Sequence, residues 1–335
     1  MTDISPASLH DSLLTLDTHI DIPWPDRGDF RSGAADRQVD LPKLRRGGLK
    51  AVCLAAYIPQ GRRTAAGHDQ AWGRVQAMLG AIGGLEGDSV RVCGTAARTR
   101  EAVAAGHVAI LPAIENGYAV GEDPARVRAL HALGARYMTL THNGHNALAD
   151  AAIPRADLDD PQELHGGLSA LGRQVIAEMN ACGMLVDVSH TSRKTMLQAV
   201  ELSRAPVVAS HSCARALCDH PRNLDDAQLD CLAESGGVVQ VTAMSSFLKP
   251  SAQGVATVDD LAAHVAYIAR RIGVAHVGIS SDFDGGGRIE GWGDAAETPN
   301  VTSALQRQGF SAEEIAAIWG GNFLRLLERV EREAA

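Results

Sequence analysis

The segment PVVASHS, residues 206–212, is apolar on both of its faces before it ends in polar residues. The segment GVVQVTAM, residues 237–244, has the same character. Such strands are typical of a parallel sheet that helices cover on one face and packed side chains fill on the other. These two segments therefore predict an α/β fold built on buried parallel strands.

Six further short runs of β-branched or apolar residues bring the predicted strands to eight; they cover residues 13–21, 49–58, 107–115, 135–142, 184–190 and 276–284. Stretches of helical periodicity lie between them, at residues 69–84, 124–133, 167–182, 192–202, 225–235 and 257–272, with a last one at 311–331. Ser311 and Glu314 have the spacing of a capping box at the start of that last helix. The alternation predicts a TIM-like (β/α)8 barrel.

No linker rich in proline, glycine and serine divides the 335 residues. Because α/β barrels routinely use a chain of this length as one unit, we expect a single domain over residues 1–335. Residues 143–166 and 285–310 are irregular and rich in glycine, aspartate, asparagine and proline. Long loops of this composition are typical of an active site that follows barrel strands.

The formal net charge of −9 and the lack of Lys/Arg runs interleaved with aromatics argue against nucleic acid as a partner. The N-terminus MTDISPASLHDSLL has no cationic start followed by an apolar stretch, and no apolar run is long enough to span a bilayer. Six cysteines without CxxC pairs fit a reducing compartment. We therefore expect a cytoplasmic protein without a membrane partner, and a homodimer as the usual assembly of a barrel enzyme.

The segment LLTLDTHIDIPW, residues 13–24, places His19 and Asp21 two positions apart at the end of a predicted strand. Residues i and i+2 of a strand share a face, so both side chains point into the barrel mouth, where together they can bind a metal ion. By itself this pattern is weak, because an aspartate that only orients a histidine gives the same spacing.

Other ionisable residues stand at equivalent places: Glu115, His142, His190, His211 and Asp282 each lie at or near the end of a predicted strand. Barrel enzymes build their active sites at this rim. A polar side chain buried without a partner costs several kcal/mol, so a shared site explains the pattern better than chance does.

Imidazole and carboxylate groups suit zinc or a similar divalent ion, and this set exceeds what one catalytic zinc needs. We therefore predict two Zn2+ ions. Two ions roughly 3.5 to 4 Å apart usually share a bridging carboxylate, and Glu115 is the only acid at the rim between residues 21 and 184. His19 and Asp21 then complete one site, and His190 and His211 complete the other.

Six motifs in this order resemble the membrane (renal) dipeptidase family, peptidase family M19, of the amidohydrolase superfamily: DTHID, AIENGY, LGARYMTLTH, VDVSH, SHSCARALCDHPRN and GISSDFDG. The resemblance runs almost from end to end. It implies the same metal ligands, with Glu115 as the bridge. It also implies that Asp282 holds the bridging water and carries its proton to the leaving amine, that His142 contacts the scissile carbonyl oxygen, and that Arg222 binds the substrate carboxylate.

These residues predict a binuclear zinc dipeptidase that acts on dipeptides with free amino and carboxyl ends and accepts D-residues at the C-terminal position. The alternatives are another amidohydrolase reaction, such as deacylation of N-acyl amino acids or lactone hydrolysis, and a non-catalytic metal-binding barrel. Trp24, Tyr57 and residues 285–297 are expected to shape the pocket. Five histidines lack a comparable placement and are expected at the surface or in loops: His68, His145, His165, His220 and His264.

Overall fold

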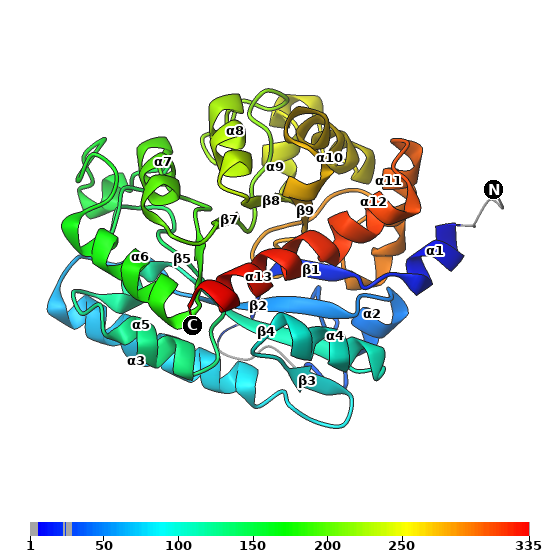
Figure 1. Cartoon of the computed structure of the whole chain (residues 1–335), viewed down its shortest axis with the longest axis horizontal. Helices are drawn as coiled ribbons and strands as arrows, with labels where there is room; N and C mark the ends of the chain where they lie inside the picture. The colour runs from blue at the N-terminus through cyan, green and yellow to red at the C-terminus, as the bar shows by residue number, and fades with distance from the viewer. Residues whose placement is uncertain (1–5, 23, 25–28, 335) are drawn as a thin grey trace.

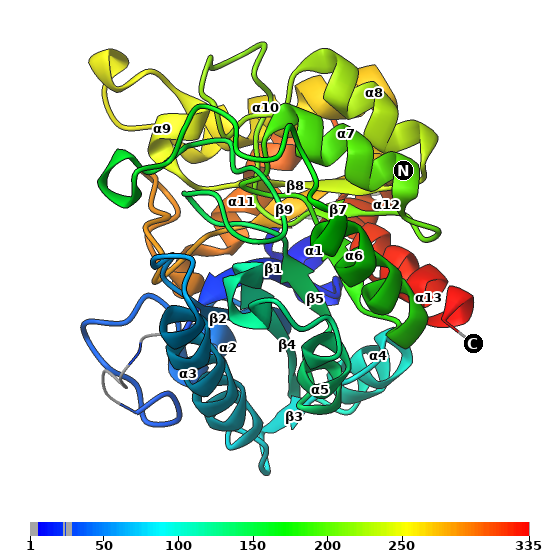
Figure 2. The same ribbon diagram turned by 90° about the vertical axis from the view of Figure 1, so that its left-hand side faces the viewer.

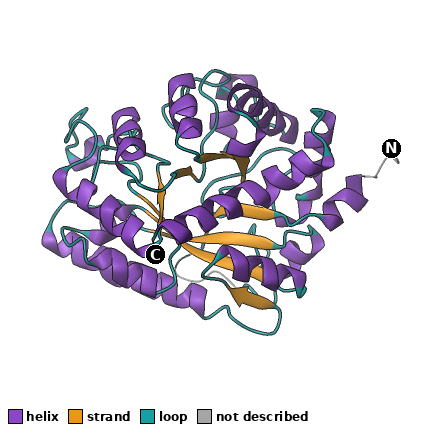
Figure 3. Cartoon of the chain, viewed as in Figure 1, coloured by secondary structure: helices purple, strands orange, loops and turns teal. Residues whose placement is uncertain are grey.

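Eight parallel strands close into a barrel in the computed structural model, which describes residues 6–22, 24 and 29–334. The barrel strands are β1 (Leu16–Asp21), β2 (Ala51–Tyr57), β4 (Val108–Glu115), β5 (Tyr137–Thr139), β6 (Leu185–Asp187), β7 (Val208–Ala209), β8 (Val238–Thr242) and β9 (Val277–Ser280). Hydrogen bonds from the Asp21 amide to the Phe283 carbonyl and from the Asp282 amide to the His19 carbonyl join the first strand to the last. The strands lie inside a layer of helices (Figure 1, Figure 3).

All eight predicted strands are present, which confirms the TIM-like (β/α)8 fold, but most are shorter than predicted. The segment predicted at 184–190 shows why. Its ladder ends at Asp187, and His190 has a φ of 64°, which turns the chain out of the sheet. The polar residues at the rim thus belong to the turns that follow the strands.

A ninth strand, β3 (Val90–Val92), was not predicted. It pairs in parallel with the first half of β4, where Val90 lies opposite Val108. β5 pairs with the second half of β4, where Ala113 lies opposite Tyr137. A three-residue strand with only one fully buried side chain carries no periodicity that a sequence pattern could detect.

The six internal helices that the periodicity predicted are confirmed; they are α3 (Ala65–Gly83), α5 (Arg126–Ala132), α6 (Ala170–Cys182), α7 (Arg193–Leu202), α8 (Asp226–Glu234) and α10 (Val258–Ile272). Five more were not predicted: α1 (Pro6–Ser12), α2 (Leu41–Arg46), α4 (Ala96–Ala104), α9 (Ser245–Leu248) and α11 (Pro299–Arg307). The last one corrects the expectation that all of residues 285–310 are irregular. Pro299 opens α11 at its first position, and the helix buries Val301 and Leu305.

The C-terminal segment forms two helices rather than the single one predicted at 311–331: α12 (Ala312–Ala316) and α13 (Asn322–Glu333), joined by a π-helical turn. The capping box of Ser311 and Glu314 is present as predicted. At Gly320 a Cβ atom would lie 2.8 Å from the Leu14 carbonyl oxygen, so the turn lies where the helix passes closest to the chain before β1. Such turns absorb an extra residue inside a helix.

The apolar face of α13 covers the N-terminal end of the barrel. Phe323 and Leu327 belong to the same buried cluster as Leu16 and Val238, which begin β1 and β8. Truncating a fully buried leucine such as Leu327 to alanine would cost about 2 to 5 kcal/mol. This end of the barrel is closed by packing, whereas the opposite end carries the polar side chains.

All strands of the described residues belong to this one sheet, and the organisation of residues 1–335 as one domain stays a prediction. In Figure 2, α3, α5 and α6 lie outside the strands that they follow or precede. None of the helices in the described part of the chain is both long and apolar enough to cross a bilayer.

Candidate metal centre

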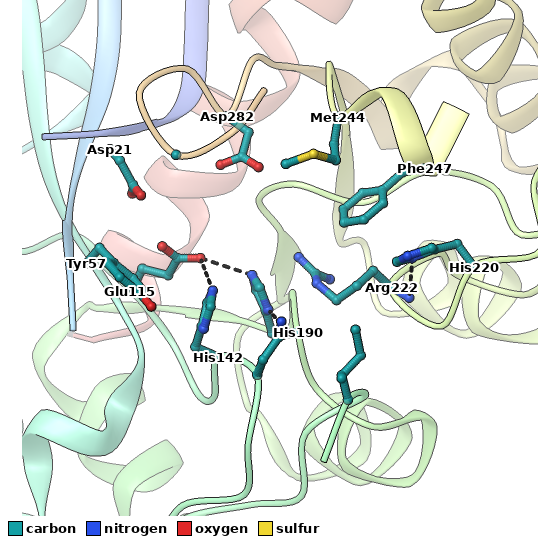
Figure 4. A pocket seen from close by; sticks show the side chains of 13 residues that line it. Asp21, Tyr57, Glu115, His142, His190, His220, Arg222, Met244, Phe247 and Asp282 are labelled. Atoms are coloured by element: carbon teal, nitrogen blue, oxygen red, sulfur yellow. Dashed lines mark hydrogen bonds and ion pairs between the residues drawn. The ribbon is translucent and has the colours of Figure 1, made fainter. Parts of the chain in front are cut away.

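The C-terminal ends of the barrel strands bring the predicted site residues together around Glu115. Glu115 is the last residue of β4 and is buried. Its carboxylate lies among four imidazole rings that come from β1 and from the turns after β5, β6 and β7 (Figure 4 shows two of them). The predicted gathering of these side chains at one rim is therefore what the structure shows.

The two oxygens of Glu115 face different histidines. Oε1 lies 3.0 Å from Nε2 of His190, 3.4 Å from Nε2 of His211 and 3.7 Å from Nε2 of His142. Oε2 lies 3.7 Å from Nε2 of His19. A carboxylate placed in this way can contribute one oxygen to each of two neighbouring cations.

The remaining carboxylates approach the centre on the His19 side. Oδ1 of Asp21 and Oδ1 of Asp282 lie 3.8 and 3.9 Å from Nε2 of His19. The shared face predicted for His19 and Asp21 is thus present, although the register between β1 and β2 shifts between Asp17 and Ile20. Three carboxylates close to one another in a buried site repel each other unless positive charge lies between them.

Several ligand atoms in this cluster are buried without a hydrogen bond. Nε2 of His19, Oδ1 of Asp21 and Nε2 of His211 have no hydrogen-bond partner among the described residues. Buried polar atoms are nearly always satisfied, so three such atoms at one point indicate that a ligand completes the site. The donor set of imidazole nitrogen and carboxylate oxygen fits a divalent cation such as zinc.

Two groups of ligand atoms lie close enough together to hold an ion, and both include Glu115. One group consists of His19, Glu115 and His211, and the other of Glu115, His142 and His190. The rings of His19 and His211 stack with their centroids 3.9 Å apart. This grouping differs from the predicted pairing of His190 with His211, and it brings His142 beside His190; the ligand assignment of each ion stays a prediction.

Hydrogen bonds to Nδ1 determine which nitrogen of two rings faces the centre. The Tyr137 hydroxyl donates to the Thr18 carbonyl oxygen and lies 2.8 Å from Nδ1 of His19, so it accepts the proton of that nitrogen. Nδ1 of His190 lies 3.1 Å from Oδ1 of Asn143, which can only accept. Both rings therefore direct Nε2 toward Glu115, as metal-binding histidines with fixed tautomers do.

Burial and neighbouring charges shift the pKa values of the cluster. Burial raises the pKa of the Asp282 carboxyl to about 7, although the charges of His19 and Arg222 act in the opposite direction. Burial alone lowers the pKa of His19, but the contact and charge of Glu115, together with the charges of Asp282 and Asp21, outweigh it and raise the value to about 10. Perturbations of this size are typical of functional sites.

Two site residues adopt left-handed backbone conformations. His190 has a φ of 64° and Asp282 a φ of 60°, and neither residue is glycine. Each such conformation costs about 1 to 3 kcal/mol and persists only where the surrounding structure imposes it. Asn116, directly after Glu115, has a φ of 90°, and its side chain donates to the Ile58 carbonyl oxygen, which holds this turn in place.

The opposite wall of the site carries a buried guanidinium. Arg222 is 3% exposed and lines the same cavity as Glu115 and Asp282, which has a volume of about 400 Å³. Its Nη2 donates weakly to the His211 carbonyl oxygen, 3.3 Å away, and its Nε has no hydrogen-bond partner within the described residues. The guanidinium also lies over the Phe247 ring, 5.3 Å from the centroid (Figure 4). No carboxylate of the described chain forms an ion pair with this side chain.

Sequence patterns missed several residues of the cavity wall. Met244 and Phe247, at the start of α9, line it together with His220, which was expected at the surface or in a loop. Tyr57 lines it as predicted, but of the predicted segment 285–297 only Gly285 does, and Trp24 lines two other cavities instead. The polar sequence DHPRN, residues 219–223, gave no signal that the His220 side chain would turn toward the cavity.

His220 lies in a loop, as expected, but the expectation for His68 and His264 is wrong. His68 lies in α3 and His264 in α10, and both are buried. His264 accepts from the Ala214 amide at Nδ1 and lies 3.0 Å from the Leu248 carbonyl oxygen at Nε2. A histidine with both nitrogens bonded to backbone serves packing, and helical periodicity alone does not separate it from a surface residue.

Imidazole and carboxylate groups gathered at the C-terminal end of a (β/α)8 barrel fit the class of metal-dependent barrel enzymes. The family follows from comparison with known proteins. The chain belongs to the membrane dipeptidase family, peptidase family M19, whose family model matches residues 6–335. It is therefore a metal-dependent peptidase by family, as the motifs predicted.

Three known proteins are similar to this chain. Dipeptidase aclJ of Aspergillus oryzae is 39% identical over 230 residues, which are 68% of this chain and 53% of that protein, so the chain spans about half the length of this relative. The probable dipeptidase PvdM from Pseudomonas aeruginosa is 30% identical and superposes with a TM-score of 0.92 over 98% of both chains. A metallo peptidase from Rhodobacter sphaeroides, liganded with a phosphinate mimic of the dipeptide L-Ala-D-Ala, is 26% identical, with a TM-score of 0.83 over 95% of this chain and 99% of that chain.

Proposed function

We propose that this protein is a binuclear zinc dipeptidase that hydrolyses dipeptides with free amino and carboxyl ends. The observation that carries the proposal is the placement of Arg222. A buried guanidinium that forms no ion pair with a carboxylate of the described residues lines the same cavity as the cluster around Glu115. A buried charge needs a counter-charge, and the planar fork of arginine matches a terminal carboxylate.

The two sides of the Glu115 carboxylate support two ions rather than one. His19 approaches Oε2 and has Asp21 beside it, whereas His190 and His211 approach Oε1. Divalent ions held there would lower the pKa of water and polarise the scissile carbonyl. Zinc suits this mixture of nitrogen and oxygen ligands.

Asp282 is the proposed proton carrier. Asp282 is 7% exposed and burial raises the pKa of its carboxyl to about 7, so it can both accept and release a proton near neutral pH. A carboxylate in this role takes the proton of the attacking water and delivers it to the leaving amine. The distance of 3.9 Å between its Oδ1 and Nε2 of His19 supports this role.

His142 is the proposed donor to the carbonyl oxygen. Its side chain is 21% exposed, more than those of His19 or His211, and it lines the cavity where a substrate would lie. Burial lowers its pKa, although the charge of Glu115 opposes this, so the ring is neutral and has one N–H to donate. A fixed donor at this point would stabilise the negative charge that develops on the carbonyl oxygen.

The acceptance of a D-residue at the C-terminal position rests on a neighbour. The Rhodobacter sphaeroides metallo peptidase is liganded with a phosphinate mimic of the dipeptide L-Ala-D-Ala, and we propose that the present chain accepts a dipeptide of the same stereochemistry. Phe247, Met244 and Ile153 contribute apolar side chains to the cavity wall, so we expect side chains of moderate size without charge to fit it best.

A panel of L,L and L,D dipeptides, assayed with and without a chelator, tests the proposal. We expect turnover that the chelator abolishes and zinc restores. The same dipeptides with an acetylated amino end or an amidated carboxyl end should be poor substrates. Faster turnover of N-acyl amino acids or lactones would favour another amidohydrolase reaction. Two bound ions without turnover of any amide or ester would favour a non-catalytic barrel.

A further inference from the structure

We propose that Asp187 and Ser210 are positioning residues that hold the His211 imidazole in the tautomer with Nε2 free for a metal ion. The inference rests on the metal-centre part of the proposed function and does not depend on the substrate. It follows from a chain of hydrogen bonds that leads from the barrel interior to a predicted ligand.

The chain begins at His211. Nδ1 of His211 lies 2.8 Å from the Ser210 hydroxyl, and this hydroxyl donates its proton to Oδ2 of Asp187. A serine hydroxyl carries one proton only, so toward His211 it can act only as an acceptor. Nδ1 of His211 must therefore carry the ring proton, which leaves the lone pair on Nε2.

Asp187 fixes the direction of these bonds. Its Oδ1 accepts from the amides of Ser189 and Ser210, at 2.9 and 3.0 Å, and its Oδ2 accepts from the Thr139 hydroxyl at 2.9 Å as well as from Ser210. The side chain is fully buried. A carboxylate that receives four donors from the protein has no capacity left for a metal ion.

Nε2, the other nitrogen of the His211 ring, faces the metal centre. Nε2 is buried, lies 3.4 Å from Oε1 of Glu115, and has no hydrogen-bond partner among the described residues. The His211 amide donates to the Ser189 hydroxyl, so the backbone that carries the ring is held as well. Partners that orient a metal-binding histidine in this way typically change metal affinity by about 10- to 100-fold.

Two serines on either side of His211 provide a matched experiment. Ser210 and Ser212 are both fully buried, but the Ser212 hydroxyl has no hydrogen-bond partner in the described part of the chain. The dissociation constant for Zn2+ is measured by competition with a chromophoric chelator on demetallated full-length protein. We expect Ser210→Ala to bind the more weakly held Zn2+ ion about 10- to 100-fold less tightly than the wild type. Ser212→Ala should bind Zn2+ like the wild type, and Ser210→Thr should restore most of the zinc affinity.

Asp187→Asn is a second, independent variant. An asparagine amide presents donors where Asp187 accepts, so the Ser210 hydroxyl is free to donate to Nδ1 of His211 and favours the wrong tautomer. Zinc affinity should fall as in Ser210→Ala, and the double variant should be no weaker than the worse single variant, because the residues act in series. Nitrogen-15 spectra of the histidine rings report the tautomer directly.

A purely structural role would lower the melting temperature without changing zinc affinity measured well below it. Unchanged zinc affinity in folded Ser210→Ala or Asp187→Asn, or an equal loss in Ser212→Ala, would overturn the inference. Additive losses in the double variant would also contradict a chain of bonds. Failure of every dipeptide to react would leave these zinc measurements unaffected, so the two proposals fail separately.

Discussion

Oε1 of Glu115 lies 3.0 Å from Nε2 of His190, a contact between the last residue of β4 and the turn that follows β6. The other oxygen of the same carboxylate faces His19 across the barrel mouth, at 3.7 Å. One side chain therefore connects the two halves of the ligand cluster. If the site binds two ions, Glu115 is the residue on which both depend.

Glu115→Gln tests this dependence. The glutamine amide can offer an acceptor to one side only and a donor to the other, so it cannot bridge two cations. We expect the metal content after dialysis to fall from two ions per chain to one or none, with loss of dipeptide turnover. Elemental mass spectrometry measures the content. Glu101→Gln, an exposed residue paired with Arg98, should retain both ions; two ions in Glu115→Gln would argue against the bridge.

Arg222→Ala tests recognition of the substrate carboxylate. Removing one partner of a buried, hydrogen-bonded charge pair costs about 2 to 5 kcal/mol, so kcat/KM for dipeptides should fall at least roughly 30-fold, mainly through KM. Arg215→Ala is the control, because Arg215 pairs with Asp219 at the surface. Amidated dipeptides should lose little further activity in Arg222→Ala. Unchanged dipeptide turnover in this variant would remove the basis for a dipeptidase.

Asp282→Asn tests the proton carrier. Asparagine keeps the shape of the side chain but cannot accept and return a proton, and general acid–base groups contribute about 100- to 10,000-fold to rate. We expect kcat to fall within this range while KM and metal content change little. A kcat within tenfold of the wild type would mean that another group carries the proton.

Metal affinity should rise with pH. The pKa of His19 is raised to about 10, so the ring of the ion-free protein is protonated at neutral pH, and an ion must displace that proton from Nε2. Each displaced proton makes the apparent affinity up to about tenfold tighter per pH unit until pH approaches 10. Chelator competition at two pH values measures the slope. An affinity that does not change between them would show that His19 is not a ligand.

The sequence predicted the barrel because its strands have two buried faces, as in PVVASHS and GVVQVTAM. It predicted the rim residues because each follows such a strand. The turns themselves were not predictable, since the φ of 64° at His190 and of 60° at Asp282 depends on tertiary contacts rather than on local preference.

Site residues that lie in short or irregular segments were also not predicted from the sequence. Phe247 lies in a four-residue helix with too little periodicity to detect, and His220 reaches the cavity from a loop. The role of Ser210 depends on Asp187, the last residue of the neighbouring strand β6, and no spacing along the chain reveals this contact. The cytoplasmic location and the homodimer stay predictions.

Anomalous diffraction at the zinc edge, from crystals of the full chain grown with Zn2+, tests the central claim most directly. Two anomalous peaks roughly 3.5 to 4 Å apart, one on each side of the Glu115 carboxylate, are the predicted result. One peak that does not contact Glu115, or none at the barrel mouth, would contradict a binuclear centre there.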